Sequence, residues 1–238
     1  MKDVDDFLNV IDLQIDKNKS EIKKTKTNRK VDMKNEQEVQ KFLDEKFYPE
    51  YTTEFKRFLD YSTQMLGVDV SFSIFNLKNI LVDEKAMTQY INQDIPTFAF
   101  ELSFRLKDGN RVVGWLLDDN KKTQYYLLVW VFADNESNGT FSKDDITYLE
   151  CILIERKTIL DFLASEGLDK QALLKKNQEI LGSSINGAID RDVNDSFYFY
   201  LSGRLREKPI NIIFKKSKLI ELGILHKKIY REDKTNLS

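Results

Sequence analysis

The segment GVDVSFSIFNLKNILVDEKA, residues 67–86, decides the fold class. Its first half alternates, with Val68, Val70, Phe72 and Ile74 on one side, which is the two-residue period of a β-strand. Its second half is a short apolar run that ends in charged residues. Because only a short turn separates the halves, we predict two adjacent strands that pair with each other.

Helical spacing precedes this segment, and further strands follow it. A helix is predicted from about Glu36, and a second helix is predicted from Pro49 to Gly67, since glycine commonly lies just past the last helical turn. Asp-Gly-Asn at 108–110 has the chemistry of a hairpin turn. Three stretches rich in aromatic and branched residues predict three more strands: 97–106, 112–119 and 125–134.

The last part of the chain returns to helix. Apolar residues at 3–4 spacing predict a helix over 144–165, and a polar helix follows to about Leu181. A linker, SSINGA, then leads to a strand-like PINIIF and a basic helix over 217–231. This order of elements indicates a mixed α/β or α+β fold whose sheet is built from strands consecutive in the sequence.

Composition supports a folded core, and charge divides the chain into three parts. Of the 238 residues, 41% are hydrophobic, which is enough for a core. The 37 basic and 39 acidic residues nearly cancel, so the basic excess of many nucleic-acid-binding proteins is absent. Basic residues nevertheless gather near both ends. We therefore expect a polar, basic N-terminal arm (1–35), a core (36–181) and a basic C-terminal segment (182–238).

Cysteine and histidine are scarce enough to exclude several classes of site. The single Cys151 excludes an internal disulfide and a multi-cysteine zinc site. The single His226 argues against mechanisms that need two imidazoles. The acidic start lacks a signal-peptide core, and no apolar run approaches the ~18 residues of a membrane span. We expect a cytoplasmic protein.

Asp69, Asp83 and Lys85 form the chemistry-bearing set. Residues two apart on a strand share a face, so Asp83 and Lys85 should be neighbours while Glu84 faces away. Pairing of the two strands would bring Asp69 to the same edge. Two carboxylates suffice to anchor Mg²⁺, and a nearby lysine can orient a water or offset the negative charge of phosphodiester cleavage.

These residues resemble the PD-(D/E)XK nuclease superfamily, which has the restriction-endonuclease-like fold. Its layout is a helix, a strand bearing an aspartate and a hydrophobic strand ending in (D/E)-x-K, and residues 40–133 follow it without the proline that often precedes the first aspartate. The resemblance implies a central mixed sheet flanked by helices. It implies a Mg²⁺ or Mn²⁺ ion held by Asp69, Asp83 and the Glu84 carbonyl, with Lys85 as the catalytic lysine. The family often adds an acidic residue from the preceding helix, for which Glu54 and Asp60 are both candidates.

The chain contains one other motif of this kind and one isolated carboxylate close to the site in sequence. ILIERK at 152–157 also reads apolar-E-x-K, but on the predicted helix Glu155 and Lys157 would lie on different faces. Glu101 stands among apolar residues of a predicted strand beside the site strand. A buried unpaired carboxylate is costly. Glu101 therefore either faces solvent or joins the site, by binding metal or by holding Lys85.

The function expected from the resemblance is a Mg²⁺-dependent endonuclease that hydrolyses DNA, with a role in restriction or defence and an arrangement as a homodimer. One alternative is a non-catalytic nucleic-acid-binding module on the same fold. A second alternative is a protein-interaction factor in which the Asp-Glu-Lys triplet is mere surface. Basic residues of the C-terminal segment could hold a nucleic-acid backbone: Lys215, Lys216, Lys218, Lys227, Lys228 and Arg231.

Overall fold

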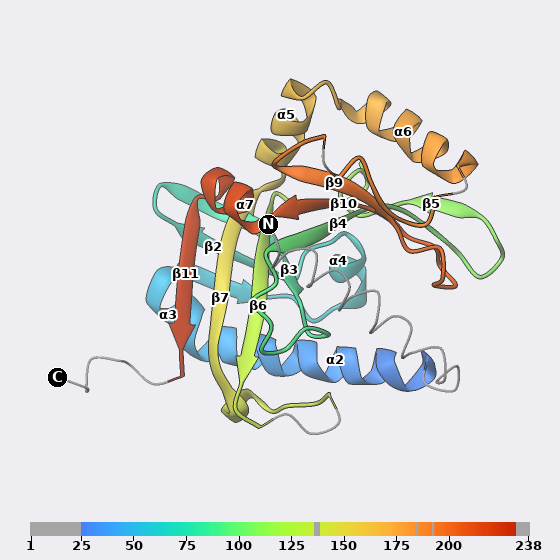
Figure 1. The fold of residues 1–238 in the computed structure, drawn as a ribbon. Helices are drawn as coiled ribbons and strands as arrows, with labels where there is room; N and C mark the ends of the chain where they lie inside the picture. Colours follow the sequence, from blue (N-terminus) through green and yellow to red (C-terminus); the bar gives the residue numbers. More distant parts are fainter. Residues whose placement is uncertain (1–24, 136–138, 184, 192, 232–238) are drawn as a thin grey trace.

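The computed structural model describes residues 25–135, 139–183, 185–191 and 193–231, with side chains described from residue 31 onward. These residues form a mixed α/β fold with two sheets, as the sequence predicted at the level of fold class (Figure 1). No helix among them is long and apolar enough to cross a membrane.

The first sheet is mixed, and its strand order is β1-β2-β3-β6-β7-β11. Strands β3 and β6 run parallel, whereas the other neighbouring pairs are antiparallel. The parallel pair exists because the chain leaves this sheet after β3 and crosses back before β6. Its strands are β1 (Thr53–Arg57), β2 (Val70–Ile74), β3 (Leu77–Ala86), β6 (Tyr125–Ala133), β7 (Ile146–Glu155) and β11 (Leu225–Tyr230).

The second sheet is antiparallel and takes strands from two distant parts of the chain. Its order is β5-β4-β10-β9-β8, so β4 pairs with a strand that follows it by about a hundred residues. The expectation of one sheet built from consecutive strands is therefore wrong. Its strands are β4 (Thr97–Arg105), β5 (Arg111–Val113), β8 (Gly187–Ile189), β9 (Phe197–Leu201) and β10 (Ile210–Lys215).

Helices cover both sheets. In Figure 1, α2 (Thr25–Phe42) lies along the lower side of the first sheet, and α5 (Arg156–Ser165) and α6 (Lys170–Gly182) lie over the second. The π-helical turn η2 (Leu43–Phe47) and α3 (Tyr48–Tyr51) continue directly from α2. Short elements complete the set: α4 (Tyr61–Met65), the 3-10 turn η3 (Lys143–Asp145) and α7 (Lys216–Leu222).

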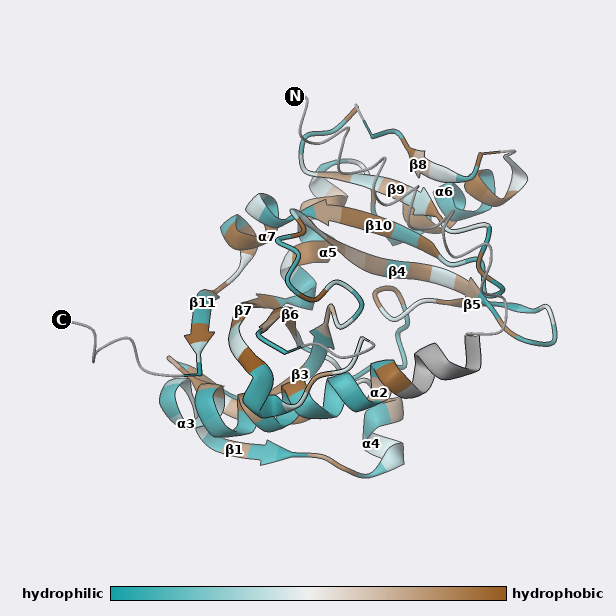
Figure 2. Cartoon of the chain, turned by 60° about the horizontal axis from the view of Figure 1, so that its bottom comes forward, coloured by the Kyte–Doolittle hydropathy of each residue, from teal (hydrophilic) through white to brown (hydrophobic). Residues whose placement is uncertain are grey.

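The apolar core consists of two clusters, one on each face of the first sheet. One cluster packs α2 and η2 against β2, β3, β6 and β7. The other packs β6 and β7 against the second sheet, with Trp130 and Phe100 fully buried between them. Figure 2 shows hydrophobic residues concentrated in the strands that face this second cluster. Two-sided burial of β6 and β7 explains why both strands are apolar almost throughout.

Several predicted strands are confirmed. Strands β2, β3, β4, β6 and β10 lie where the sequence placed them, and the turn at 108–110 joins β4 to β5 as a hairpin. Gly67 lies directly past α4 with a φ of 73°. The strand expected over 112–119 is shorter, because β5 ends at Val113.

Three helix predictions are wrong in part. The helix expected from Pro49 to Gly67 is interrupted by β1, and only α3 and α4 are helical. The helix expected over 144–165 is β7 followed by α5. The basic helix expected over 217–231 ends at Leu222, and β11 follows. In β7 the apolar run is buried on both faces, so its sequence lacks the alternation that marks a one-sided strand.

The expected boundary at 35–36 falls inside a helix, whereas the one at 181–182 falls at the end of α6. Helix α2 runs through position 35, and the earlier part of the N-terminal arm, residues 1–24, lies outside the described residues. The C-terminal segment adds β8, β9 and β10 to the second sheet and β11 to the first. It is therefore an integral part of both sheets.

Candidate active site

Pairing of β2 with β3 brings Asp69 and Asp83 together. The Asp69 N–H donates to the Val82 carbonyl at 2.9 Å, and Val70 lies opposite Val82 in the antiparallel register. Burial, together with the Asp83 carboxylate, raises the pKa of Asp69 to about 6. Two like charges therefore share one partly desolvated site, as the strand pairing predicted.

Lys85 faces the same site. Its Nζ donates to Asp83 Oδ1 at 2.6 Å, and the Asp83 side chain is only 5% exposed. Burial alone lowers the pKa of Lys85, but the carboxylates of Asp83 and Asp69 outweigh it and raise that pKa. The ammonium also lies 5.4 Å from the ring centroid of Trp115. Lys85 is thus a fixed, protonated cation beside two carboxylates.

Gly67 closes one wall of the site by a close approach of the backbone. Thr123 Oγ1 donates to the Gly67 carbonyl at 2.5 Å. A Cβ at this position would lie 2.5 Å from Thr123 Oγ1, 3.1 Å from Lys121 Cδ and 3.6 Å from Asp83 Oδ2. The positive φ of 73° disfavours any side chain as well. Glycine here therefore sets the distance between β2 and the loop before β6.

Helix α2 contributes a carboxylate that sequence reasoning missed. Glu36 is an exposed residue, but desolvation by the neighbouring protein raises the pKa of its carboxyl. The Lys85 charge lowers that pKa, whereas Asp32 and Asp69 raise it, so Glu36 shares the electric field of the site. Asp32 and Glu36 also line a cleft of about 240 Å³ that continues along residues 86–90. The available signal was this pair of carboxylates one turn apart on the preceding helix.

Glu101 reaches this region from the second sheet and does not lie beside the site strand, because β3 is flanked by β2 and β6. Burial and the charge of Glu207 raise the pKa of Glu101 to about 7, while Lys85 and Arg111 oppose the shift. Among the described residues, no hydrogen bond or ion pair reaches its carboxylate. Glu101 is therefore half-buried within the electric field of Lys85 without holding it directly.

Glu54 and Asp60, the two candidates for an added acidic residue, make contacts elsewhere. Glu54 accepts a hydrogen bond from Ser73 Oγ at 2.5 Å, near the end of β2 that lies away from Asp69. Asp60 is the N-cap of α4 and accepts from the Thr63 N–H at 2.9 Å. Hydrogen bonds from Ser62 and Thr63 lower the pKa of Asp60 to about 2. The acidic residues that α2 brings near the site are instead Asp32 and Glu36.

The second apolar-E-x-K motif does not form a comparable site. Glu155 ends β7 and accepts from Thr158, and Lys157 pairs with Asp161 on the exposed surface of α5. The upstream acidic pair at 144–145 lies before the opposite end of β7. Ten residues of strand span about 30 Å, which is too far for shared ligation.

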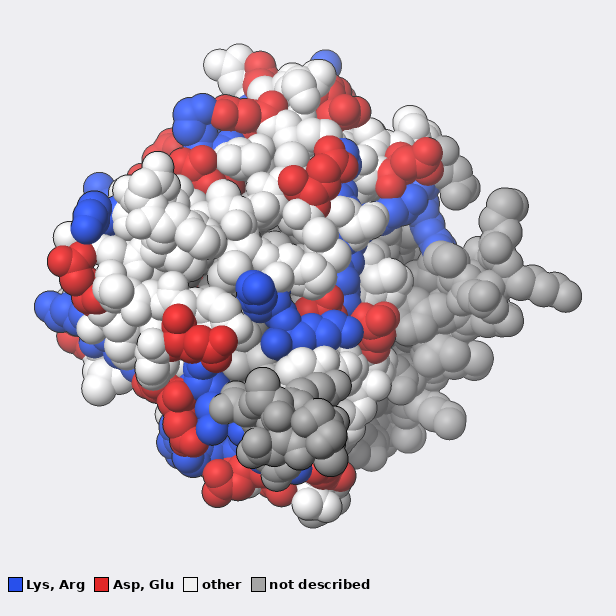
Figure 3. All heavy atoms as spheres, turned by 90° about the vertical axis from the view of Figure 1, so that its left-hand side faces the viewer, with Lys and Arg blue, Asp and Glu red and all other residues white. Residues whose placement is uncertain are grey.

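The basic residues of the C-terminal segment lie away from this site, and most are paired with carboxylates. Strand β11 is separated from β3 by β6 and β7. Figure 3 shows this side of the molecule, where Lys and Arg alternate with Asp and Glu. Lys215 pairs with Asp195, Lys216 with Asp94 and Glu150, Lys218 with Glu221 and Arg231 with Asp134, while Lys227 and Lys228 lie over Tyr51 and Tyr148.

The donor set at the site fits a hard divalent cation. Asp69 and Asp83 supply two carboxylates, and Mg²⁺ is commonly held by one or two carboxylates with waters completing its shell. The Glu84 carbonyl leaves β3 on the same edge as the Glu84 N–H, which donates to Asp69 Oδ2 at 2.8 Å. Within the described part of the chain, no group of three or more His, Cys, Asp or Glu side chains forms a metal site.

Comparisons with protein-family models, with curated proteins and with solved structures found no match to this chain.

Proposed function

We propose that this chain is a metal-dependent nuclease of the PD-(D/E)XK type that hydrolyses DNA phosphodiester bonds. The observation that carries the proposal is the convergence of Asp69, Asp83 and Lys85 at one edge of the β2–β3 pair. A helix carrying Glu36 precedes this pair, and the sheet that contains it is mixed. The restriction-endonuclease-like arrangement is proposed on the same grounds.

Asp69, Asp83 and the Glu84 carbonyl would hold Mg²⁺ or Mn²⁺. When bound, such an ion polarises a phosphoryl oxygen and lowers the pKa of a water next to it. The raised pKa of Asp69 supports this role, because two adjacent carboxylates without a cation repel each other. A divalent cation would remove that repulsion.

Lys85 would offset the negative charge that develops on the phosphate and orient the attacking water. Its ammonium is already fixed on Asp83 and Trp115, so little reorganisation is needed. Lys121 lies beside Gly67 and is the basic side chain next to this site on the loop before β6. We propose Lys121 as a phosphate contact in preference to the C-terminal lysines. Restriction or defence against foreign DNA remains the proposed biology, and a homodimer the proposed assembly.

The test is cleavage of supercoiled plasmid, single-stranded DNA and RNA with Mg²⁺ or Mn²⁺. Asp83→Ala should abolish cutting, and Lys85→Ala should slow it by on the order of 10²–10³, as for loss of one group that stabilises charge in a transition state. Asp144→Ala is the matched control, because this side chain is 85% exposed and lies at the far end of β7.

Each outcome has a definite meaning. Cutting that disappears in both site variants and survives in the control supports the proposal. Cutting that persists in both variants would place the active site elsewhere. DNA binding without cutting at any metal concentration would favour the non-catalytic binding module.

A further inference from the structure

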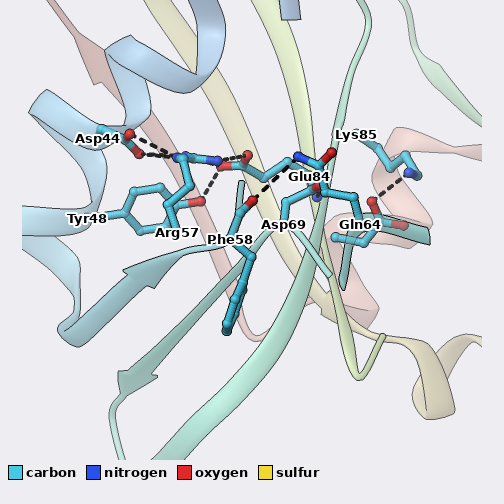
Figure 4. Close-up of polar contacts among 9 residues, drawn as sticks. Asp44, Tyr48, Arg57, Phe58, Gln64, Asp69, Glu84 and Lys85 are labelled. Atoms are coloured by element: carbon cyan, nitrogen blue, oxygen red, sulfur yellow. Dashed lines mark hydrogen bonds and ion pairs between the residues drawn. The ribbon is translucent and has the colours of Figure 1, made fainter. Parts of the chain in front are cut away.

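Behind the site, on the opposite face of β3, lies a partly buried network of charges that the proposed chemistry does not use. Glu84 points away from Asp83 and Lys85, and its side chain is only 5% exposed. Arg57 of β1 donates to both of its carboxylate oxygens, at 2.6 and 3.0 Å, and Tyr48 donates to Oε1 at 2.5 Å. Arg57 also donates to both oxygens of Asp44 in η2 (Figure 4).

Two hydrogen bonds donated by backbone N–H groups join this network to the site. The Glu84 N–H donates to Asp69 Oδ2 at 2.8 Å. The N–H of Phe58, the residue after Arg57, donates to the Asp69 carbonyl at 2.8 Å. Figure 4 shows Arg57 and Asp69 on either side of Glu84. Arg57 therefore fixes the side chain of Glu84, and the N–H of Glu84 in turn holds the Asp69 carboxylate. Phe58, the next residue after Arg57, holds the Asp69 backbone carbonyl.

Stability alone is a poor explanation for such a network. Burying Arg57 with Glu84 costs desolvation energy, while Asp44 stays 37% exposed, and well-packed apolar side chains in place of a buried ion pair are often equally stable or better. Bidentate Arg–carboxylate pairs do, however, fix geometry more strictly than apolar contacts. The network is therefore suited to holding the end of β3 in one position.

We propose that Arg57 is a positioning residue for the metal site. By locking Glu84 in place, it keeps the Glu84 amide on Asp69 Oδ2, so that Asp69 faces Asp83 before any cation binds. The inference rests on the proposed function for its metal, but the geometry that it describes exists in the metal-free chain. Residues that orient metal ligands typically contribute a factor of about 10–100 in metal affinity.

The first experiment measures Mn²⁺ affinity by calorimetry for the full chain and for Arg57→Met. The expected result is a 10–100-fold weaker affinity at an unchanged folded fraction. Lys216→Met is the matched control, because Lys216 at the start of α7 is also a buried cation bound to two carboxylates, Glu150 and Asp94, but lies away from Asp69. It should destabilise the fold and leave Mn²⁺ affinity within about twofold, since a merely structural role does not reach the site.

A second pair of variants covers the case in which Arg57→Met fails to fold. Glu84→Gln keeps an oxygen that accepts from Tyr48 but removes the negative charge that Arg57 binds. Its control is Glu150→Gln, which makes the same change in the buried carboxylate bound by Lys216 and His226. Glu84→Gln should weaken Mn²⁺ binding, and Glu150→Gln should not. Arg57→Lys should restore only part of the affinity, because lysine keeps the charge but not the fork.

A metal-free readout separates this inference from the proposed function. Hydrogen exchange of the Glu84 amide should be slow in the unmodified chain and faster in Arg57→Met, because its bond to Asp69 is no longer held. Unchanged exchange and unchanged Mn²⁺ affinity in Arg57→Met would overturn the inference and leave the nuclease proposal standing. No Mn²⁺ binding by the unmodified chain would overturn both the proposed metal site and this role for Arg57.

Discussion

Asp69→Asn should stabilise the metal-free protein at alkaline pH while destroying its proposed activity. In the folded chain, burial and the nearby Asp83 carboxylate raise the pKa of Asp69 from 3.8 to about 6. Asparagine has nearly the same shape, retains an oxygen that can accept from the Glu84 N–H and carries no charge. The substitution therefore removes the repulsion and the desolvation cost together.

The sign and size follow from proton linkage. Because the folded-state pKa of Asp69 lies above the unfolded value, the folded chain binds its proton more tightly, and Asp69 lowers the stability as pH rises from 3.8 to about 6. At about 1.4 kcal/mol for each pH unit, that difference corresponds to about 3 kcal/mol. Asp69→Asn should therefore match the wild type below pH 3.8 and exceed it by up to about 3 kcal/mol above pH 6.

The assay is urea unfolding of both proteins in EDTA across this pH range, with the difference in free energy of unfolding plotted against pH. Asp60→Asn is the control of opposite sign, because hydrogen bonds lower the pKa of Asp60 to about 2 and its contribution to stability is lost as pH falls. A difference for Asp69→Asn that does not change between the acid and alkaline ends would refute the reasoning. So would a variant that is less stable than the wild type at alkaline pH.

Three further predictions concern the surroundings of the site. Gly67→Ala should lower stability by more than the ~1–2 kcal/mol of a left-handed backbone, because its Cβ would also meet Thr123 Oγ1 at 2.5 Å; Gly167→Ala, with a φ of 78° and open space around it, should show the backbone cost alone in thermal melts. Glu101→Gln should raise the melting temperature above pH 7 and leave it unchanged below pH 4.5, since the folded-state pKa of Glu101 is raised to about 7; equal effects at both ends would contradict this. Burial raises the pKa of the Cys151 thiol, so a thiol reagent should modify it only after urea unfolding, and rapid reaction of the native chain would show that β7 opens.

The sequence by itself determined the centre of the candidate site. Alternation over residues 68–74 fixed which side of β2 is buried, and the short turn to β3 required antiparallel pairing. The two-residue spacing of Asp83 and Lys85 then placed them on one face and Glu84 on the other. These features depend on contacts between neighbouring stretches of chain, so local pattern was sufficient to predict them.

Local pattern failed where burial is two-sided. Residues 151–154 of β7 are apolar on both faces, because β7 lies between the two core clusters, and the apolar residues of β7 also fit helical spacing. The partner strands β6 and β11 decided the outcome by satisfying the backbone hydrogen bonds of β7 on both sides.

Only the tertiary structure brought in Glu36 and the Arg57 network, and only it showed which sheet carries Glu101. Glu36 comes from a helix more than thirty residues before Asp69, and Glu101 comes from a strand that pairs with β10 in another sheet. Arg57 finds Glu84 because β1 forms a sheet edge where a helix was expected. These residues meet because the folded chain must cover its apolar faces and must pair its buried charges. Both requirements depend on the complete fold, so no single stretch of sequence predicts them.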